Sequence, residues 1–320
     1  MSESREQSGE CAEVLISGRE TPCVRVGYSC AFSLYQTILA LGSGRDETDL
    51  GLPPDPLWRR AAAQAGHLRS PLGPFNYFEF ALVRAVGPDD FRLALAARAQ
   101  EFARELSDAL ASVAALYRRE VWPKHQALLD TALEELVTLM EPRKDRLLGE
   151  IAALLGVTAR PAECIVTLVP TCHIRMGGYS HPTVLDVTRY HGSQLLEALV
   201  HELAHVLAAS AVGGEGSSYT LFREAIRSRG WTEQEAAELF HLVIFHISGR
   251  VVRNSGLPDH RPIGEQREVY SRVQRRLRAT LTPSAIDTAL SRWQDGVTDF
   301  PGALADALPS RLEGESSCGG

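Results

Sequence analysis

The sequence predicts a mainly helical α+β protein, and three observations lead to this fold class. From Asp89 to about Leu155 the chain is rich in alanine, leucine, arginine and glutamate, a composition typical of long helices. At Arg160–Pro161 the pattern changes to short β-branched runs, which are typical of strands. Further helical segments follow these runs. We therefore expect an N-terminal helical subdomain, and then a second domain in which helices accompany a small sheet.

The expected domain boundaries follow the same changes. The first residues are mostly polar, with a short apolar patch at Val14–Ile16 that could form a weakly attached strand. The last residues also have the composition of a tail. The resulting division is a tail at 1–20, a helical subdomain at 21–160, a second domain at 161–300 and a tail at 301–320.

Helices account for most of the first half. The apolar and aromatic run Val24–Leu41 predicts one helix, and the block 89–121 predicts a longer one. Pro123 lacks the N–H that the helical ladder needs, so it kinks or restarts the helix. Two further helices are expected at 125–140 and at 142–155.

The second half alternates strands and helices. Cys164–Val169 and Thr183–Thr188 are short β-branched runs and predict two strands. A glycine-rich connection at 213–218 precedes the expected helix Tyr219–Arg229. Thr232 and Glu235 form a capping box that begins the next helix, which extends to about Arg253. Two more helices are expected at Val269–Leu281 and Ala285–Trp293.

Composition narrows the possible partners and the compartment. The chain has 320 residues, is 44% hydrophobic and 23% charged, and carries a net charge of −7 without a basic block. No nucleic-acid or membrane partner is therefore expected. The six cysteines form no C-x-x-C pair. No stretch has the pattern of a signal peptide or of an 18-residue apolar span, so a cytoplasmic location is expected.

The segment Gln194–Ala209 carries the chemistry. Its leucines and valines recur at helical spacing, and Ser193 is a plausible N-cap. His201 and His205 are four residues apart, so on a helix they lie on one face and can reach the same metal ion. Glu202 lies beside them and can act on a metal-bound water. This is the H-E-x-x-H motif of zinc metallopeptidases, and Zn²⁺ is the expected cofactor.

A zinc site of this kind needs a third protein ligand. The pattern H-E-x-x-H-x-x-G-x-x-H does not apply, because alanines occupy the positions it would use. Glu224 follows His205 with eighteen residues between them. With this spacing, residues 164–229 resemble the gluzincin group of zincin-like metallopeptidases, in particular its zinc aminopeptidase branch. The resemblance implies a zincin-like metal domain in which Glu224 is the third ligand, and Glu215 and His241 are the competing candidates.

The motif predicts hydrolysis of peptide or protein substrates by a metal-activated water. Glu202 would be the general base, and a donor from Tyr219, His241 or His246 would stabilise the tetrahedral intermediate. Two other interpretations stay open. The chain could be a catalytically inactive zincin-fold binding or regulatory module, or a helical interaction protein whose histidines bind no metal.

Overall fold

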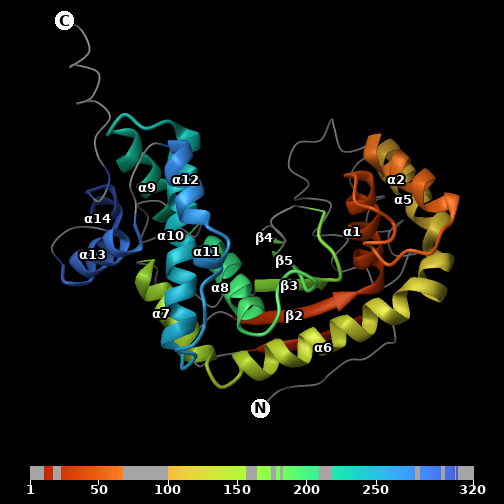
Figure 1. The fold of residues 1–320 in the computed structure, drawn as a ribbon, viewed down its shortest axis with the longest axis horizontal. Coiled ribbons are helices and arrows are strands. Elements are labelled where there is room, and N and C mark those ends of the chain that lie inside the picture. Colours follow the sequence, from red (N-terminus) through yellow and green to blue (C-terminus); the bar gives the residue numbers. More distant parts are fainter. Residues whose placement is uncertain are drawn as a thin grey trace, which may run out of the picture. The chain divides into compact units, whose positions relative to one another are not determined.

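The computed structural model describes most of the chain, and the described residues fall into two compact units. They are 11–16, 23–67, 100–155, 164–173, 178–180, 183–208, 218–277, 282–296, 300–306 and 308. Their structure is α+β and mainly helical, which confirms the expected class (Figure 1). The first unit comprises 1–17, 23–142 and 162–195, and the second comprises 18–22, 143–161 and 196–320.

The first unit contains a mixed five-stranded sheet with the order β1-β2-β3-β5-β4. Its two outer pairs, β1 with β2 and β4 with β5, are antiparallel, whereas β2, β3 and β5 run parallel to one another. β3 and β5 lie where β-branched runs predict them. The strands are β1 (Cys11–Ile16), β2 (Val24–Ser29), β3 (Cys164–Val169), β4 (Gly178–Ser180) and β5 (Thr183–Asp186).

The start of this unit confirms the strand alternative for Val14–Ile16 and differs from the expectation of a single helix at Val24–Leu41. Residues 11–16 form β1, and the run that begins at Val24 is first a strand and then a helix. Val24, Val26 and Tyr28 are buried in alternation with half-buried residues, which is the two-residue period of a strand. The helix begins after Ser29, whose Oγ accepts a hydrogen bond from the backbone N–H of Phe32 at 3.1 Å.

Helices pack on this sheet and on one another. α6 contacts β1, β2 and β3, and α1 contacts β2 and β3, while α2 packs between α1 and α5. Trp58, Tyr35 and Tyr117 are among the largest fully buried side chains. Residues 89–99 of the expected long helix lie outside the described residues. The helices are α1 (Cys30–Gly42), α2 (Pro56–His67), α5 (Gln100–Leu116), the π-helical turn η1 (Tyr117–Val121) and α6 (Trp122–Met140).

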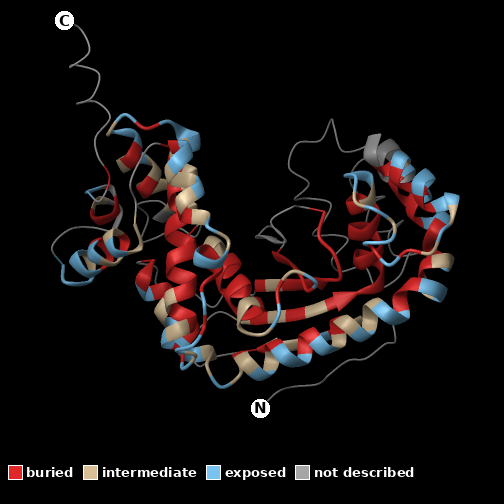
Figure 2. Cartoon of the chain, viewed as in Figure 1, coloured by how far each residue is buried: buried red, intermediate tan, exposed pale blue. Residues whose placement is uncertain are grey.

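The described part of the second unit is helical, with α10 at its centre. α10 contacts α7, α9, α11, α12 and α13, and Figure 2 shows it as buried along most of its length. The predicted capping box is present, since Thr232 and Glu235 each bond the other's backbone N–H. The helices are α7 (Lys144–Leu154), α8 (Ser193–Ala208), α9 (Ser218–Arg227), α10 (Glu233–Asn254), α11 (Ile263–Gln266), α12 (Val269–Leu277), α13 (Pro283–Gln294) and α14 (Phe300–Asp306).

The two units divide the chain differently from the expected boundary at 160/161. The strands at 164–186 pair with strands from the N-terminal segment, so they belong to the first unit together with the helices at 30–140. α7 belongs to the second unit, although the sequence places it in the helical subdomain. The C-terminal α14 lies within the segment expected to be a tail. In the described part of the chain, no helix is both long and apolar enough to cross a membrane.

Candidate metal centre

Three histidines of the second unit converge on one point. His201 and His205 come from α8 and His241 comes from α10, and one ligand nitrogen of each lies within 4.8 Å of the others. The Nε2 atom of His201 is 2.9 Å from that of His241 and 3.2 Å from that of His205. His201 is buried, while His205 and His241 are half-buried. We call these residues the histidine cluster.

The sequence of α8 explains how the first two histidines are held. The apolar face predicted for this helix is buried, which fixes the rotation of the helix about its axis. His201 and His205 then project together, one turn apart, and their ring centroids are 4.8 Å apart. The buried apolar residues of α8 include Leu195, Leu196, Leu199, Val200, Leu203 and Leu207.

The third histidine, His241, lies on α10, which runs antiparallel to α8. Beyond the cluster, the His201 ring packs on Phe245 of α10 with centroids 4.3 Å apart. One turn further in each helix, Glu197 Oε1 lies 3.4 Å from the position that a Cβ of Gly249 would take. Moving toward the N-terminus of α8 therefore means moving toward the C-terminus of α10. This seam, from the histidine cluster through Phe245 to Glu197 and Gly249, places His241 opposite the histidine pair.

Hydrogen bonds among the three imidazole rings cannot satisfy all of the converging Nε2 atoms. A neutral imidazole nitrogen is either a donor with one proton or an acceptor with one lone pair. Nε2 of His201 faces two other Nε2 atoms at hydrogen-bond distance, and it can serve only one of them well. Three lone pairs that converge on a shared cation meet no such limit. The donor set therefore fits a divalent transition metal, for which imidazole nitrogen is a preferred ligand.

Burial keeps His201 and His241 in the neutral state that binds metal. The pKa of His201 lies well below its ordinary value, first because the ring is buried and then because His205 and His241 are close. Burial lowers the pKa of His241 to about 4. A metal ligand must be a neutral imidazole, so at neutral pH these two rings need not lose a net charge before they bind an ion.

Glu202 is another buried ionisable residue of α8. It follows His201 directly and is 8% exposed. Burial raises the pKa of its carboxyl to about 8. A carboxyl group with a pKa close to neutrality is suited to exchanging protons with a substrate or a water.

Glu224, the expected third ligand, is not part of the histidine cluster. It is exposed on α9, whereas the buried residues of that helix are Phe222 and Ile226. Phe222 packs on Phe240 of α10 with ring centroids 5.2 Å apart. Since Glu224 lies between the two buried positions in sequence, it falls on the opposite face of the helix. The structure thus brings His241, one of the competing candidates, to the histidine pair and leaves Glu224 exposed, while Glu215 lies outside the described residues.

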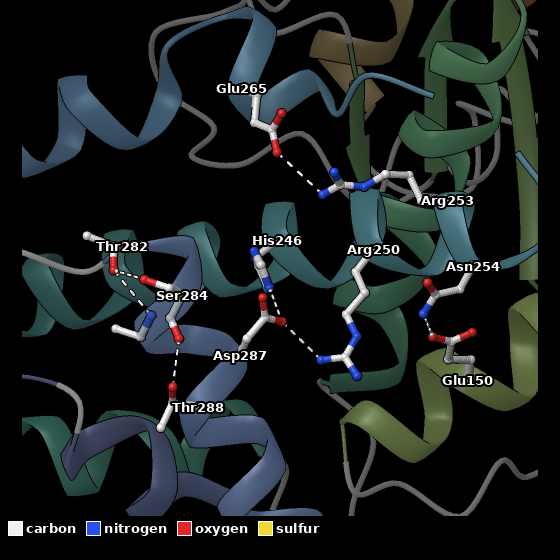
Figure 3. Close-up of polar contacts among 11 residues, drawn as sticks. Glu150, His246, Arg250, Arg253, Asn254, Glu265, Thr282, Ser284, Asp287 and Thr288 are labelled. Atoms are coloured by element: carbon white, nitrogen blue, oxygen red, sulfur yellow. Dashed lines mark hydrogen bonds and ion pairs between the residues drawn. The ribbon is translucent and has the colours of Figure 1, made fainter. Parts of the chain in front are cut away.

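His246 and Tyr219 are engaged elsewhere. His246 is five residues after His241, which turns it by about 140° around α10. Its Nε2 lies 2.8 Å from Oδ1 of Asp287, which also accepts a hydrogen bond from Arg250 at 3.0 Å (Figure 3). Tyr219 packs on Phe240, with ring centroids 5.1 Å apart, and under the guanidinium of Arg223. Both residues thus contribute contacts between helices.

Sequence reasoning missed one buried polar pair next to the cluster. Glu197 lies one turn before His201 on α8, and its Oε2 is 2.7 Å from Nε2 of His260 and accepts the backbone N–H of Ile263 at 2.8 Å. Both side chains are 1% exposed. Burial raises the pKa of Glu197, and the hydrogen bonds from His260 and Ile263 oppose that shift. The signal in the sequence is a glutamate four residues before a metal-ligand candidate, on the same face of the helix.

Comparisons with models of protein families, with curated proteins and with solved structures found no match to this chain.

Proposed function

We propose that the chain is a zinc-dependent metallopeptidase of the H-E-x-x-H class, with His201, His205 and His241 as metal ligands and Glu202 as the general base. The observation that carries the proposal is the convergence of three Nε2 atoms around the motif. Three protein ligands with a fourth position left open are typical of catalytic zinc sites. Structural zinc sites instead have four protein ligands.

The ligand set separates this proposal from the gluzincin branch. That branch completes its site with a glutamate, and the residue at the matching spacing here, Glu224, is exposed on α9. His241 offers a nitrogen ligand 2.9 Å from that of His201. The proposed site is therefore a three-histidine variant, with a peptide or protein as substrate.

The zinc ion and Glu202 have separate roles in the proposed hydrolysis. A zinc ion bound there supplies Lewis acidity and lowers the pKa of a coordinated water. Glu202 takes a proton from the attacking water and delivers it to the leaving amine. Its buried position favours the protonated carboxyl, and a nearby cation favours the carboxylate, so occupancy of the site shifts Glu202 toward the base form.

The test combines metal content with turnover. Protein purified without chelators is expected to carry one zinc per chain and to cleave an unstructured protein substrate. Glu202→Gln removes the base and should lower kcat by about 10²–10⁴-fold while zinc stays bound. Asp287→Asn is the matched control, because it changes an acidic residue of the same unit that contacts His246 and not the histidine cluster.

The outcomes distinguish the alternatives. A chain that binds no zinc contradicts the metal centre and favours a helical interaction protein. A chain that binds zinc without any turnover supports a non-catalytic binding or regulatory module. Turnover that survives Glu202→Gln contradicts the role given to Glu202.

A further inference from the structure

Two buried polar atoms on α8 have no hydrogen-bond partner among the residues that the structure describes. They are Oε1 of Glu197 and Nδ1 of His201. The two residues are four apart, so their Cβ atoms lie about 5–6 Å from each other on one face of the helix. Helical side chains lean toward the N-terminus, which directs the His201 ring toward the turn that carries Glu197. Buried polar atoms are nearly always paired, so two neighbouring orphans point to a missing interaction.

Metal binding at the histidine cluster indicates which interaction is missing. When Nε2 of His201 is a ligand, the ring proton must be on Nδ1. Nδ1–H is then a buried donor, and it has no partner at its present position. Metal-bound histidines almost always donate this proton to a carboxylate, a backbone carbonyl or a water.

The carboxylate of Glu197 is arranged to accept one more donor. Its Oε2 already accepts from His260 and from the backbone of Ile263, whereas Oε1 accepts from no donor in the described part of the chain. Gly249 on α10 lies beside Oε1, and a Cβ at this position would come within 3.4 Å of that oxygen. The two oxygens turn together about the terminal torsion, which has a broad minimum, so a small rotation brings Oε1 toward a new donor and changes the Oε2 contacts only slightly.

We propose that Glu197 is a positioning residue for the metal centre, whose Oε1 accepts the Nδ1–H of His201 and holds the ring with Nε2 directed at the ion. This inference rests on the proposed metal site. It extends that site by one turn along α8, to Glu197. The carboxylate also increases the basicity of the His201 ligand, because it stabilises the proton on the far nitrogen.

The experiment measures zinc affinity by competition with a chromophoric chelator on the full chain. Glu197→Gln keeps an oxygen for His260 and Ile263 and puts an amide NH₂ at Oε1, where it faces another donor. Zinc affinity should fall by about 10–100-fold, the range for outer-shell partners of a ligand. His260→Gln is the matched control, since it removes a partner of Oε2 and leaves Oε1 in place. Its affinity should stay close to that of the wild type.

Three results overturn the proposal. Equal affinity in Glu197→Gln and the wild type shows that Oε1 has no role. An equal loss in Glu197→Gln and His260→Gln shows that the pair acts only through packing. A wild type that binds no zinc removes the metal centre and this inference together. By contrast, wild-type binding with an unaffected Glu197→Gln variant leaves the centre intact and overturns this inference alone.

A second measurement needs no variant, in case Glu197→Gln does not fold. Long-range ¹H–¹⁵N correlation spectra of the zinc-loaded wild type report the tautomer of each histidine. His201 should show a slowly exchanging Nδ1–H with a nuclear Overhauser effect to the γ protons of Glu197. A rapidly exchanging proton, or coordination through Nδ1, contradicts the proposal.

Discussion

His241 is half-buried on α10, with its Nε2 2.9 Å from that of His201, whereas Glu224 is exposed on α9. Substituting alanine at the two positions should therefore have very different effects on zinc affinity. We predict that His241→Ala lowers zinc affinity by more than the roughly 10–100-fold typical of outer-shell changes. Glu224→Ala and His246→Ala should leave the affinity near the wild-type value. Chelator competition on the three variants measures the order of their zinc affinities. A larger loss of affinity in Glu224→Ala than in His241→Ala would identify Glu224 as the third ligand.

The same residues show how much of the site could be read from sequence. His201, Glu202 and His205 are within five consecutive positions, so the helix alone fixes which of them share a face. His241 comes from another helix, and its approach to His201 depends on how α8 and α10 pack. No local pattern encodes that packing. Glu224 was preferred because its spacing matched a family, and its exposure on α9 could not be seen in the sequence.

At the scale of elements, α10 packs so closely that one of its positions accepts only glycine. A Cβ at Gly249 would lie 2.6 and 2.9 Å from two ring carbons of Pro262. We predict that Gly249→Ala lowers the free energy of unfolding by about 1–3 kcal/mol, the range for overpacking, despite the better helix propensity of alanine. Urea unfolding of the variant measures this change.

Gly149 on α7 provides the matched control. It is exposed within the helix, and a Cβ there would meet nothing within 4 Å. Gly149→Ala should therefore raise the free energy of unfolding by up to about 1 kcal/mol, the propensity difference between the two residues. If both variants were stabilised to the same extent, the close contact of Gly249 with Pro262 would not exist in solution.

Element prediction succeeded where the signal was local and failed where it was not. The capping box at Thr232 and the β-branched runs of β3 and β5 mark their elements within a few residues. β2 was missed because its alternating residues run directly into α1 and extend its apolar stretch. The pairing of Val24 with Cys164 joins residues far apart in the chain, so no periodicity could show that the N-terminal strands complete the sheet.

At the scale of the whole molecule, a half-buried histidine in the first unit links stability to pH. His125 on α6 lies 2.9 Å from the hydroxyl of Tyr117 through its Nδ1, and it also bonds the backbone of Leu50. Burial lowers its pKa to about 4 from an ordinary value of 6.5. Between these values the unfolded chain binds a proton that the folded chain does not. The free energy of unfolding therefore falls as the pH drops from 6.5 toward 4.

The expected loss follows from the size of the shift. At pH 5 it amounts to at most about 2 kcal/mol from this one group, at 1.36 kcal/mol per pH unit. His125→Gln removes the titrating ring and retains a donor and an acceptor. Other buried histidines and the carboxylates titrate alike in both chains, so the difference between wild type and variant isolates His125. Urea unfolding at pH 7 and pH 5 should give the wild type the steeper decline, and parallel declines would mean that His125 is protonated as readily in the folded state as in the unfolded one.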